Sequence, residues 1–316
     1  MRNRFFEDLT AAARRDPDIV LITADIGFRA VEPFIEACPK QFLNVGVAEQ
    51  NMAGIAAGIA LGGARVFTYS IANFPTLRCL EQIRNDIAYH HADVTVVAVG
   101  GGMAYGALGM SHHATEDLAI MRAVPNIAVA APGDPVETGA VMADLLNNGG
   151  PAYLRLGKAG ERQVHPAPLS LVRGESVLVR DRGGPVVLFS TGGILDVAVQ
   201  AADLLEAEGL PVDVRSFPWL NPLDVCAVKD AAQRYEAIVT IEEHSIVGGL
   251  GSTIAETLAE WPERVPLVRI GLPNRTFSLV GDQDYLRAAH GLDPQAISRR
   301  VLDHREASRG LASQVR

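Results

Sequence analysis

Short runs of apolar and β-branched residues alternate with longer amphipathic stretches along the first half of the chain. These runs predict strands at 19–23, 42–46, 64–70, 94–100, 127–132 and 151–156. The stretches between them predict helices near 4–15, 49–61, 76–90, 115–123 and 134–147. The last helix has a favourable start, with Asp134 as its cap and Pro135 in its first turn. This alternation favours right-handed crossovers and a parallel sheet.

The pattern stops at 157–184, which is rich in Gly, Pro and charged residues and lacks helical periodicity. We expect a linker with a small hairpin there. A second α/β set follows, with strands at 185–193, 211–217, 237–244 and 266–272. The sequence therefore predicts two α/β domains, each a mainly parallel sheet flanked by helices. Their expected bounds are 1–160 and 185–304, with a linker at 161–184 and a polar, flexible tail at 305–316.

Composition agrees with buried parallel strands and excludes several classes of protein. The chain of 316 residues is 48% hydrophobic but only 6% aromatic, so small and aliphatic side chains fill its core. Its net charge of −9 and the lack of a basic stripe argue against nucleic-acid binding. No run reaches the about 18 apolar residues of a membrane span, and the charged amphipathic start does not resemble a signal peptide. Cys38, Cys79 and Cys226 fit no metal spacing, so we expect a cytoplasmic protein with reduced thiols.

Two glycine clusters could suggest nucleotide binding. "VAVGGGMAYGALG" follows a predicted strand, but no helix start or ribose-binding acid follows at the spacing of a dinucleotide fold. "EEHSIVGGLGS" lacks the Lys-Ser/Thr of a phosphate-binding loop. Neither cluster therefore supports a nucleotide site.

Two titratable features remain ambiguous when each is taken alone. Glu49 begins the small, apolar helix "EQNMAGIAAGIALGG", where an acid is also favoured by the helix dipole. His112 and His113 are adjacent, so at most one of them is expected to face a substrate. A loop histidine pair is more often structural or solvated than catalytic.

Four blocks taken together resemble the transketolase family over nearly the full length of the chain. They are "GVAEQNMAGIAAGIALGG", "YSIANFPTLRCLEQIRND", "GALGMSHHATEDLAIMRAVPNIAVAAPGDPVE" and "GPAYLRLGK", in the family's order and with similar spacings. The resemblance is to that family's pyrimidine-binding domain followed by its C-terminal domain. It implies an enzyme that uses thiamine diphosphate to transfer a two-carbon ketol unit between sugars.

The resemblance assigns cofactor-binding roles to several residues. It gives Glu49 the role of the family glutamate, a catalytic residue that hydrogen-bonds the aminopyrimidine of thiamine diphosphate. Phe74 lies in the block where the family packs an aromatic ring on the pyrimidine, with Tyr69 as an alternative. Arg78, in the same block, is a further candidate, and Asp25 matches an acid at the thiazolium end. Capping of the turn after the first strand is an alternative role for Asp25.

Substrate contacts are implied by the same resemblance. His112 matches a family histidine that contacts substrate oxygens near the reacting carbon, where a donor could steady a developing alkoxide. Leu108 replaces a family aspartate that contacts the donor hydroxyl, which leaves the preferred donor open. Lys158 aligns with an arginine that binds the sugar phosphate, and lysine keeps the charge but loses the bidentate fork. Arg2 resembles a second phosphate-side arginine.

The family's pyrophosphate-binding domain has no counterpart in this sequence. That domain is marked by Gly-Asp-Gly and a downstream Asn, which hold the pyrophosphate and Mg²⁺, and the "GDQ" at 281–283 lies in the wrong domain. The resemblance is thus to the C-terminal subunit of a split transketolase, with the Mg²⁺ ligands on a partner chain. Because the family binds its cofactor between subunits, we expect an α2β2 assembly with an N-terminal-type partner.

Two other hypotheses remain open from the sequence. The β subunit of a 2-oxo-acid dehydrogenase-type E1, or an enzyme like deoxyxylulose-phosphate synthase, shares the domain order. A non-catalytic paralogue that only binds or regulates a partner is a different class, disfavoured by the presence of Glu49, Phe74 and His112.

Overall fold

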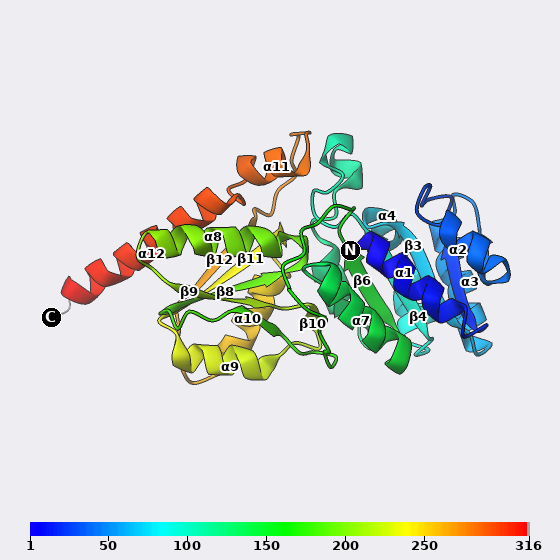
Figure 1. Cartoon of the computed structure of the whole chain (residues 1–316), viewed down its shortest axis with the longest axis horizontal. Helices are drawn as coiled ribbons and strands as arrows, with labels where there is room; N and C mark the ends of the chain where they lie inside the picture. Colours follow the sequence, from blue (N-terminus) through cyan, green and yellow to red (C-terminus); the bar gives the residue numbers. More distant parts are fainter. Residues whose placement is uncertain (315–316) are drawn as a thin grey trace.

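Two parallel-dominated sheets of seven and five strands form the centres of two α/β domains that lie side by side (Figure 1). The computed structural model describes residues 1–314, with side chains to residue 308. The first sheet has the order β10-β5-β6-β4-β3-β1-β2, and the second has the order β12-β11-β8-β9-β7. The predicted α/β class and two-domain architecture are confirmed.

The first sheet contains the six strands predicted from the first half of the chain. They are β1 (Ile19–Thr23), β2 (Phe42–Asn44), β3 (Arg65–Ile71), β4 (Val94–Val99), β5 (Ala128–Ala130) and β6 (Ala152–Leu156). All of their pairings with one another are parallel. Strands β3 and β4 are buried at nearly every position, and most of these positions carry apolar residues.

Helices cover both faces of this sheet. The longer ones are α1 (Arg2–Ala13), α3 (Glu49–Leu61), α6 (Asp117–Ala123) and α7 (Pro135–Asn148). Shorter elements are α2 (Glu32–Ala37) and the 3₁₀ turns η1 (Pro39–Gln41), η3 (Gly106–Leu108) and η4 (Met110–His112). Helix α1 packs on α7 (Figure 1). The predicted cap of α7 is confirmed, because the Asp134 carboxylate accepts a hydrogen bond of 2.8 Å from the Glu137 amide.

The helix predicted at 76–90 is broken into three pieces. Helix α4 (Asn73–Leu77) and the single turn α5 (Leu80–Gln82) are followed by the π-helical segment η2 (Ile83–Ala88). Apolar side chains still face the core, with Cys79, Ile83 and Ile87 buried. Spacing alone therefore indicated the buried face correctly but not the change in helical pitch, a change often found near functional sites.

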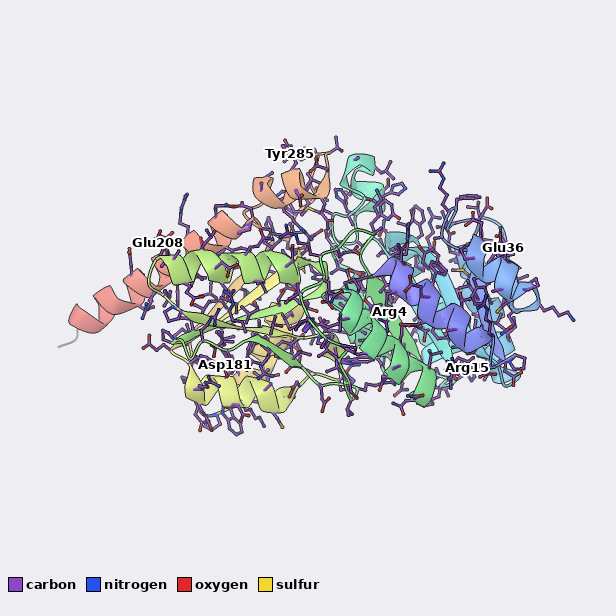
Figure 2. All side chains as sticks on the ribbon, in the orientation of Figure 1. Arg4, Arg15, Glu36, Asp181, Glu208 and Tyr285 are labelled. Carbon is purple, nitrogen blue, oxygen red and sulfur yellow. The ribbon has the colours of Figure 1, made fainter. Side chains whose placement is uncertain are left out.

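The second sheet contains the four strands predicted for the second half. They are β8 (Val186–Thr191), β9 (Val212–Ser216), β11 (Ala237–Ser245) and β12 (Leu267–Leu272). The surrounding elements are η5 (Gly192–Ile194), α8 (Leu195–Ala207), α9 (Val225–Arg234), α10 (Leu250–Ala259), α11 (Gln283–Ala289) and α12 (Pro294–Gln314). Charged side chains such as Asp181 and Glu208 lie at the periphery (Figure 2), and apolar ones fill the layers.

The expected hairpin at 157–184 is wrong. Only β7 (Val177–Arg180) forms in this segment, and it pairs antiparallel with β9 at the edge of the second sheet. Its pairing partner is thus far downstream, which local turn signals could not indicate.

The two domains share a strand and a core. Strand β10 (Trp219–Asn221) comes from the second half of the chain but pairs antiparallel with β5 of the first sheet. One continuous buried cluster runs from Met52 and Val96 in the first domain to Phe189 and Ile254 in the second. The domains therefore share one apolar core and are not joined through a flexible hinge.

Helix α12 extends through most of the segment expected to be a flexible tail, 305–316, whose last two residues lie outside the described part. Among the helices of residues 1–314, none combines the length and apolar character that crossing a membrane requires.

Candidate functional site

Most of the residues singled out by sequence lie where strands of the first sheet end. Asp25 follows β1, Glu49 follows β2, Phe74 follows β3, His112 follows β4 and Lys158 follows β6. Parallel strands bring their carboxyl ends to one edge of the sheet, which is where open α/β folds bind ligands. The same edge carries Arg78, whereas Tyr69 lies within β3 and Arg2 begins α1.

Glu49 is a buried carboxylate with a single hydrogen-bond partner among the described residues. Its side chain is 5% exposed, and its Oε1 accepts a hydrogen bond of 2.9 Å from Arg78, whose side chain is 49% exposed. The apolar side of α3, with Met52, Ala53 and Ala56, is buried behind it. One oxygen thus remains for a ligand that donates a hydrogen bond.

Phe74 and Arg78 form the next part of the site. The Arg78 guanidinium lies 4.3 Å from the centroid of the Phe74 ring, and that ring is only half-buried. Tyr69 is instead buried, stacked on Phe5 and packed against Phe6. Burial raises the pKa of Tyr69, so this hydroxyl stays protonated. Of the two aromatic candidates, Phe74 has the ring that a ligand could reach.

Cys79, next to Arg78, offers no nucleophile. Burial, together with the negative charge of Glu49, raises the pKa of its thiol to about 12. The thiol therefore stays protonated at neutral pH and serves in packing.

The two adjacent histidines face different surroundings, as expected of neighbours in the chain. The His112 ring lies 5.2 Å from the Phe74 ring, centroid to centroid, and its Nδ1 lies 2.9 Å from the Ser111 hydroxyl. His113 is buried, and burial lowers the pKa of its imidazole. Only His112 is half-exposed beside the aromatic ring, so it is the histidine available to a substrate.

Tyr105 connects the histidine to the phosphate-side residues, although no sequence motif pointed to it. Its ring lies 6.5 Å from that of His112 and 5.0 Å from the Lys158 ammonium. Burial raises the pKa of Tyr105, and the positive charge of Arg2 opposes that rise. Its only local signal was an aromatic residue in a glycine-rich loop after a strand.

Asp25 and Leu108 are the outlying members of the set. Asp25 is exposed and has a φ of 57°. Its Oδ1 accepts a hydrogen bond of 3.2 Å from Asn44 Nδ2, between the ends of β1 and β2. Leu108, in the position of the family aspartate, projects an exposed apolar side chain from η3. The structure thus brings Glu49, Arg78, Phe74, His112, Tyr105 and Lys158 into one series of contacts and leaves Asp25 outside it.

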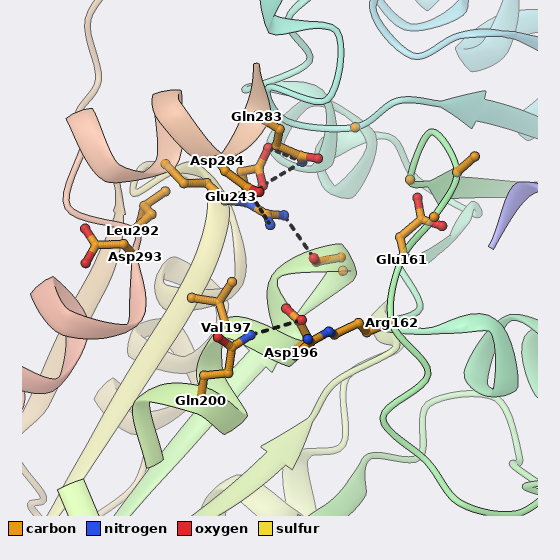
Figure 3. A pocket seen from close by; sticks show the side chains of 18 of the residues that line it. Glu161, Arg162, Asp196, Val197, Gln200, Glu243, Gln283, Asp284, Leu292 and Asp293 are labelled. Atoms are coloured by element: carbon orange, nitrogen blue, oxygen red, sulfur yellow. Dashed lines mark hydrogen bonds and ion pairs between the residues drawn. The ribbon is translucent and has the colours of Figure 1, made fainter. Parts of the chain in front are cut away.

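A cavity of about 650 Å³ lies between the two domains, and none of the predicted site residues lines it. Its wall includes the turn Gly192–Gly193, Gly157, the segment from Ala159 to Arg162, Glu243 and the start of α11 (Figure 3). Within residues 1–314, no group of three or more His, Cys, Asp or Glu side chains is arranged to hold a metal ion.

Comparison with known families agrees with this geometry. Residues 1–162 match the pyrimidine-binding domain of transketolase, and residues 174–297 match the transketolase C-terminal domain. Together these matches cover the edge that carries Glu49, Phe74, His112 and Lys158.

Individual relatives include both split and single-chain enzymes. The chain is 35% identical to one of the subunits of the apulose-4-phosphate transketolase of Phocaeicola vulgatus, over 96% of each chain. It is 36% identical to 1-deoxy-D-xylulose-5-phosphate synthase of Chlorobium luteolum, but 95% of this chain spans only 47% of that enzyme. A solved split-gene transketolase, described as an inactive β4 tetramer, is 33% identical with a TM-score of 0.86, over 96% of each chain. The chain therefore belongs to the transketolase family, as the subunit of a split transketolase that carries the pyrimidine-binding and C-terminal domains.

Proposed function

We propose that this chain, joined to an N-terminal-type partner, transfers a two-carbon ketol unit between phosphorylated sugars with thiamine diphosphate as cofactor. The relatives support a sugar substrate, because they include transketolase subunits named for apulose 4-phosphate and 6-deoxy-6-sulfo-D-fructose. The observation that carries the proposal is the series of contacts from Glu49 through Phe74 and His112 to Lys158.

The residues at one end of this series suit an aminopyrimidine ring. Glu49 offers a carboxylate oxygen without a hydrogen-bond partner among the described residues, and Phe74 offers an accessible aromatic face. A planar heteroaromatic ring needs both a hydrogen-bond partner at its edge and an apolar surface at its face. When bound, thiamine diphosphate supplies the carbanion chemistry that a ketol transfer needs.

Each residue of this chain then has a definite task. Glu49, whose side chain is largely buried, holds a proton at a pyrimidine nitrogen, and Arg78 fixes the orientation of the carboxylate. His112, fixed next to Ser111, donates a hydrogen bond to a substrate oxygen on which negative charge develops. Asp25, at the end of β1, is a further member of the cofactor-binding region, while the buried Tyr69 packs beneath the edge of the sheet.

Lys158 and Arg2 are proposed to bind the substrate phosphate. The exposed Lys158 ammonium lies 5.0 Å from the Tyr105 ring and has no carboxylate within ion-pair distance among the described residues. A free point charge at the far end of the site from Glu49 suits a phosphate at the end of a sugar.

The partner subunit is expected to cover the exposed apolar side chains around the site. Large apolar residues project from the segments that carry the site residues: Phe28, Leu43, Val47, Leu77, Leu108 and Met110. On α3, a Cβ at Gly54 or Gly58 would have no atom within 4 Å, which leaves a flat face for close packing. These surfaces suit an obligate interface in an α2β2 assembly, with Mg²⁺ and the pyrophosphate held by the partner. The three free cysteines are consistent with the cytoplasm.

Co-expression with a partner chain that carries Gly-Asp-Gly and a downstream Asn tests the proposal. The purified complex, with thiamine diphosphate and Mg²⁺, should transfer a ketol unit from a ketose phosphate to an aldose phosphate. The chain without its partner should show no transfer, and native mass spectrometry should find two copies of each subunit.

The donor distinguishes the related enzymes. Release of carbon dioxide from pyruvate, without ketol transfer, would contradict the proposal and favour a synthase or dehydrogenase-type reaction. Cofactor binding and turnover by this chain alone would contradict the need for a partner.

A further inference from the structure

The segment after β4, residues 100–113, carries Tyr105 and His112 and is anchored by the second domain. At its base, Gly102 and Ala114 exchange two backbone hydrogen bonds of 2.9 Å in an antiparallel bridge. Between these residues the backbone forms the short turns η3 and η4 and no longer element. The placement of His112 therefore depends on what holds the base of this loop.

Glu243 holds one side of that base. This residue of β11 is 4% exposed, and its Oε1 accepts a hydrogen bond of 2.6 Å from the Met103 amide. Gly102 is at φ +68°, and a Cβ there would collide with the Glu243 carboxylate. The carboxylate thus lies directly against the backbone at Gly102 and Met103, an approach that a larger residue would block.

Glu243 is itself fixed from the far side. Gln283 donates to both of its oxygens at 2.9 and 3.0 Å (Figure 3), and Arg287 Nε donates to Oε2 at 2.6 Å. Arg287 also donates to the Gly193 carbonyl at 2.9 Å. The carboxylate therefore has every partner it can use, and its position is determined by α11 and η5.

Arg155 holds the other side of the base. Its Nη2 donates to the Ala114 carbonyl at 3.0 Å and to the Glu243 carbonyl at 2.9 Å. Its Nε lies 3.0 Å from the Asp117 carboxylate, and a Cβ on Gly101 would collide with its side chain. Both ends of the loop are thus tied to Glu243, one through its carboxylate and the other through its carbonyl.

We propose that Glu243 is a positioning residue, through which the C-terminal domain sets the place of His112 in the reaction. This inference rests on the proposed function for the part that concerns catalysis. A loop without its own regular structure needs such anchors, because displacing a catalytic group by about 1 Å costs up to about a hundredfold in rate.

Glu242 provides a matched control. It is the preceding residue of β11 and is fully buried, but its side chain points to the other face of the sheet. There its carboxylate accepts hydrogen bonds from the Leu250 and Gly251 amides at 2.7 and 2.9 Å, at the start of α10. Glu242→Gln therefore replaces the same type of side chain at the same depth without contacting the loop.

Hydrogen exchange on the full chain tests the anchoring without any assay of activity. Glu243→Gln removes the charge that binds Arg287 and Gln283, so backbone amides within 103–112 should exchange at least about tenfold faster. Glu242→Gln should leave the exchange of these amides unchanged. Unchanged exchange in Glu243→Gln would overturn the proposal, whatever the enzyme turns out to catalyse.

A double-mutant cycle in the reconstituted complex tests the effect on catalysis. Glu243→Gln should lower kcat about ten- to a hundredfold while leaving the thiamine diphosphate concentration for half-maximal activity unchanged. In a His112→Ala background the same change should have almost no further effect, because it acts through His112. Equal losses in both backgrounds would overturn the proposal. A wild-type complex without ketol transfer would refute the proposed function, while the exchange measurement would still decide the role of Glu243.

Discussion

Glu49 and Glu243 are buried to nearly the same degree, 5% and 4% exposed, yet their surroundings differ in kind. Glu243 has partners on both oxygens, all from its own chain: an amide, a carboxamide and a guanidinium. Among the described residues Glu49 has one hydrogen-bond partner, the half-exposed Arg78. A buried carboxylate that its own chain satisfies supports structure, whereas one left incomplete indicates a partner that has yet to bind. Burial alone would not separate these two roles.

The same contrast holds for the regions around them. The seam between the domains is lined by a continuous apolar cluster and by paired polar groups. The edge of the first sheet instead presents exposed apolar side chains such as Phe28 and Val47. One region is complete within the chain, and the other has the character of half an interface.

Removing the proton-holding group at the incomplete site should have the largest effect. Glu49→Gln keeps an oxygen for Arg78 but cannot hold a proton as a carboxyl group does. We expect kcat of the reconstituted complex to fall about 10²- to 10⁴-fold. The thermal midpoint of the free chain should change little, since one hydrogen bond is kept. Activity within twofold of wild type would show that Glu49 takes no part in the reaction.

The free energy of unfolding should depend on pH through Glu242, whose hydrogen-bond partners come from its own chain. Burial, against the opposing amide hydrogen bonds, raises the pKa of this carboxyl from 4.5 to about 7. The folded state therefore keeps a proton that the unfolded state releases, so stability is fully present below about pH 4.5 and falls as pH rises to about 7. The loss is roughly 3 kcal/mol at most, at about 1.4 kcal/mol per pKa unit.

Urea unfolding at about pH 5 and about pH 7.5 checks this sign. As pH rises, the free energy of unfolding of the wild type should fall relative to that of Glu242→Gln. A shift in the opposite direction, or none, would mean that Glu242 is ionised in the folded protein.

Adding a methyl group in the packed region between the domains should lower the free energy of unfolding. Gly101→Ala would place a Cβ in collision with the Arg155 side chain. We expect the free energy of unfolding to fall by about 1–3 kcal/mol, as for other overpacked sites. Gly54→Ala is the matched control, because the added Cβ meets no atom within 4 Å on the exposed face of α3. That change should stabilise the free chain by up to about 1 kcal/mol. Equal effects of the two changes would remove the distinction between the regions.

Removing the positive charge of Lys158, on the phosphate side of the site, should have the smallest effect. Lys158→Ala should raise KM for a phosphorylated acceptor about tenfold, the loss of one exposed charge–phosphate contact. KM for the matching non-phosphorylated sugar should stay within about twofold, and Lys158→Arg should restore the phosphorylated acceptor. Equal losses for both acceptors would place the phosphate elsewhere.

Much of this molecule could be predicted from sequence where local pattern and motif carry the information. The ten predicted strands exist because apolar β-branched runs are buried on both faces of a parallel sheet. Glu49, Phe74 and His112 were indicated by motifs that each follow a strand. Strands β7 and β10 were missed because their partners, β9 and β5, are supplied only by the folded chain. Tyr105 and Glu243 were missed for the same reason, since neither has a pattern apart from its neighbours in space.

Strand β10 also bears on how this chain could be divided. Cutting after residue 162, where the match to the first domain ends, would leave Ala128–Ala130 as an unpaired strand edge. It would also strip the shared apolar cluster of its second half, including Phe189 and Ile254. Such a fragment would expose a hydrophobic edge to aggregation and lose the anchor of the His112 loop. The two family domains are therefore one unit of folding, and a chain cut between them would lose the support of its own His112 loop.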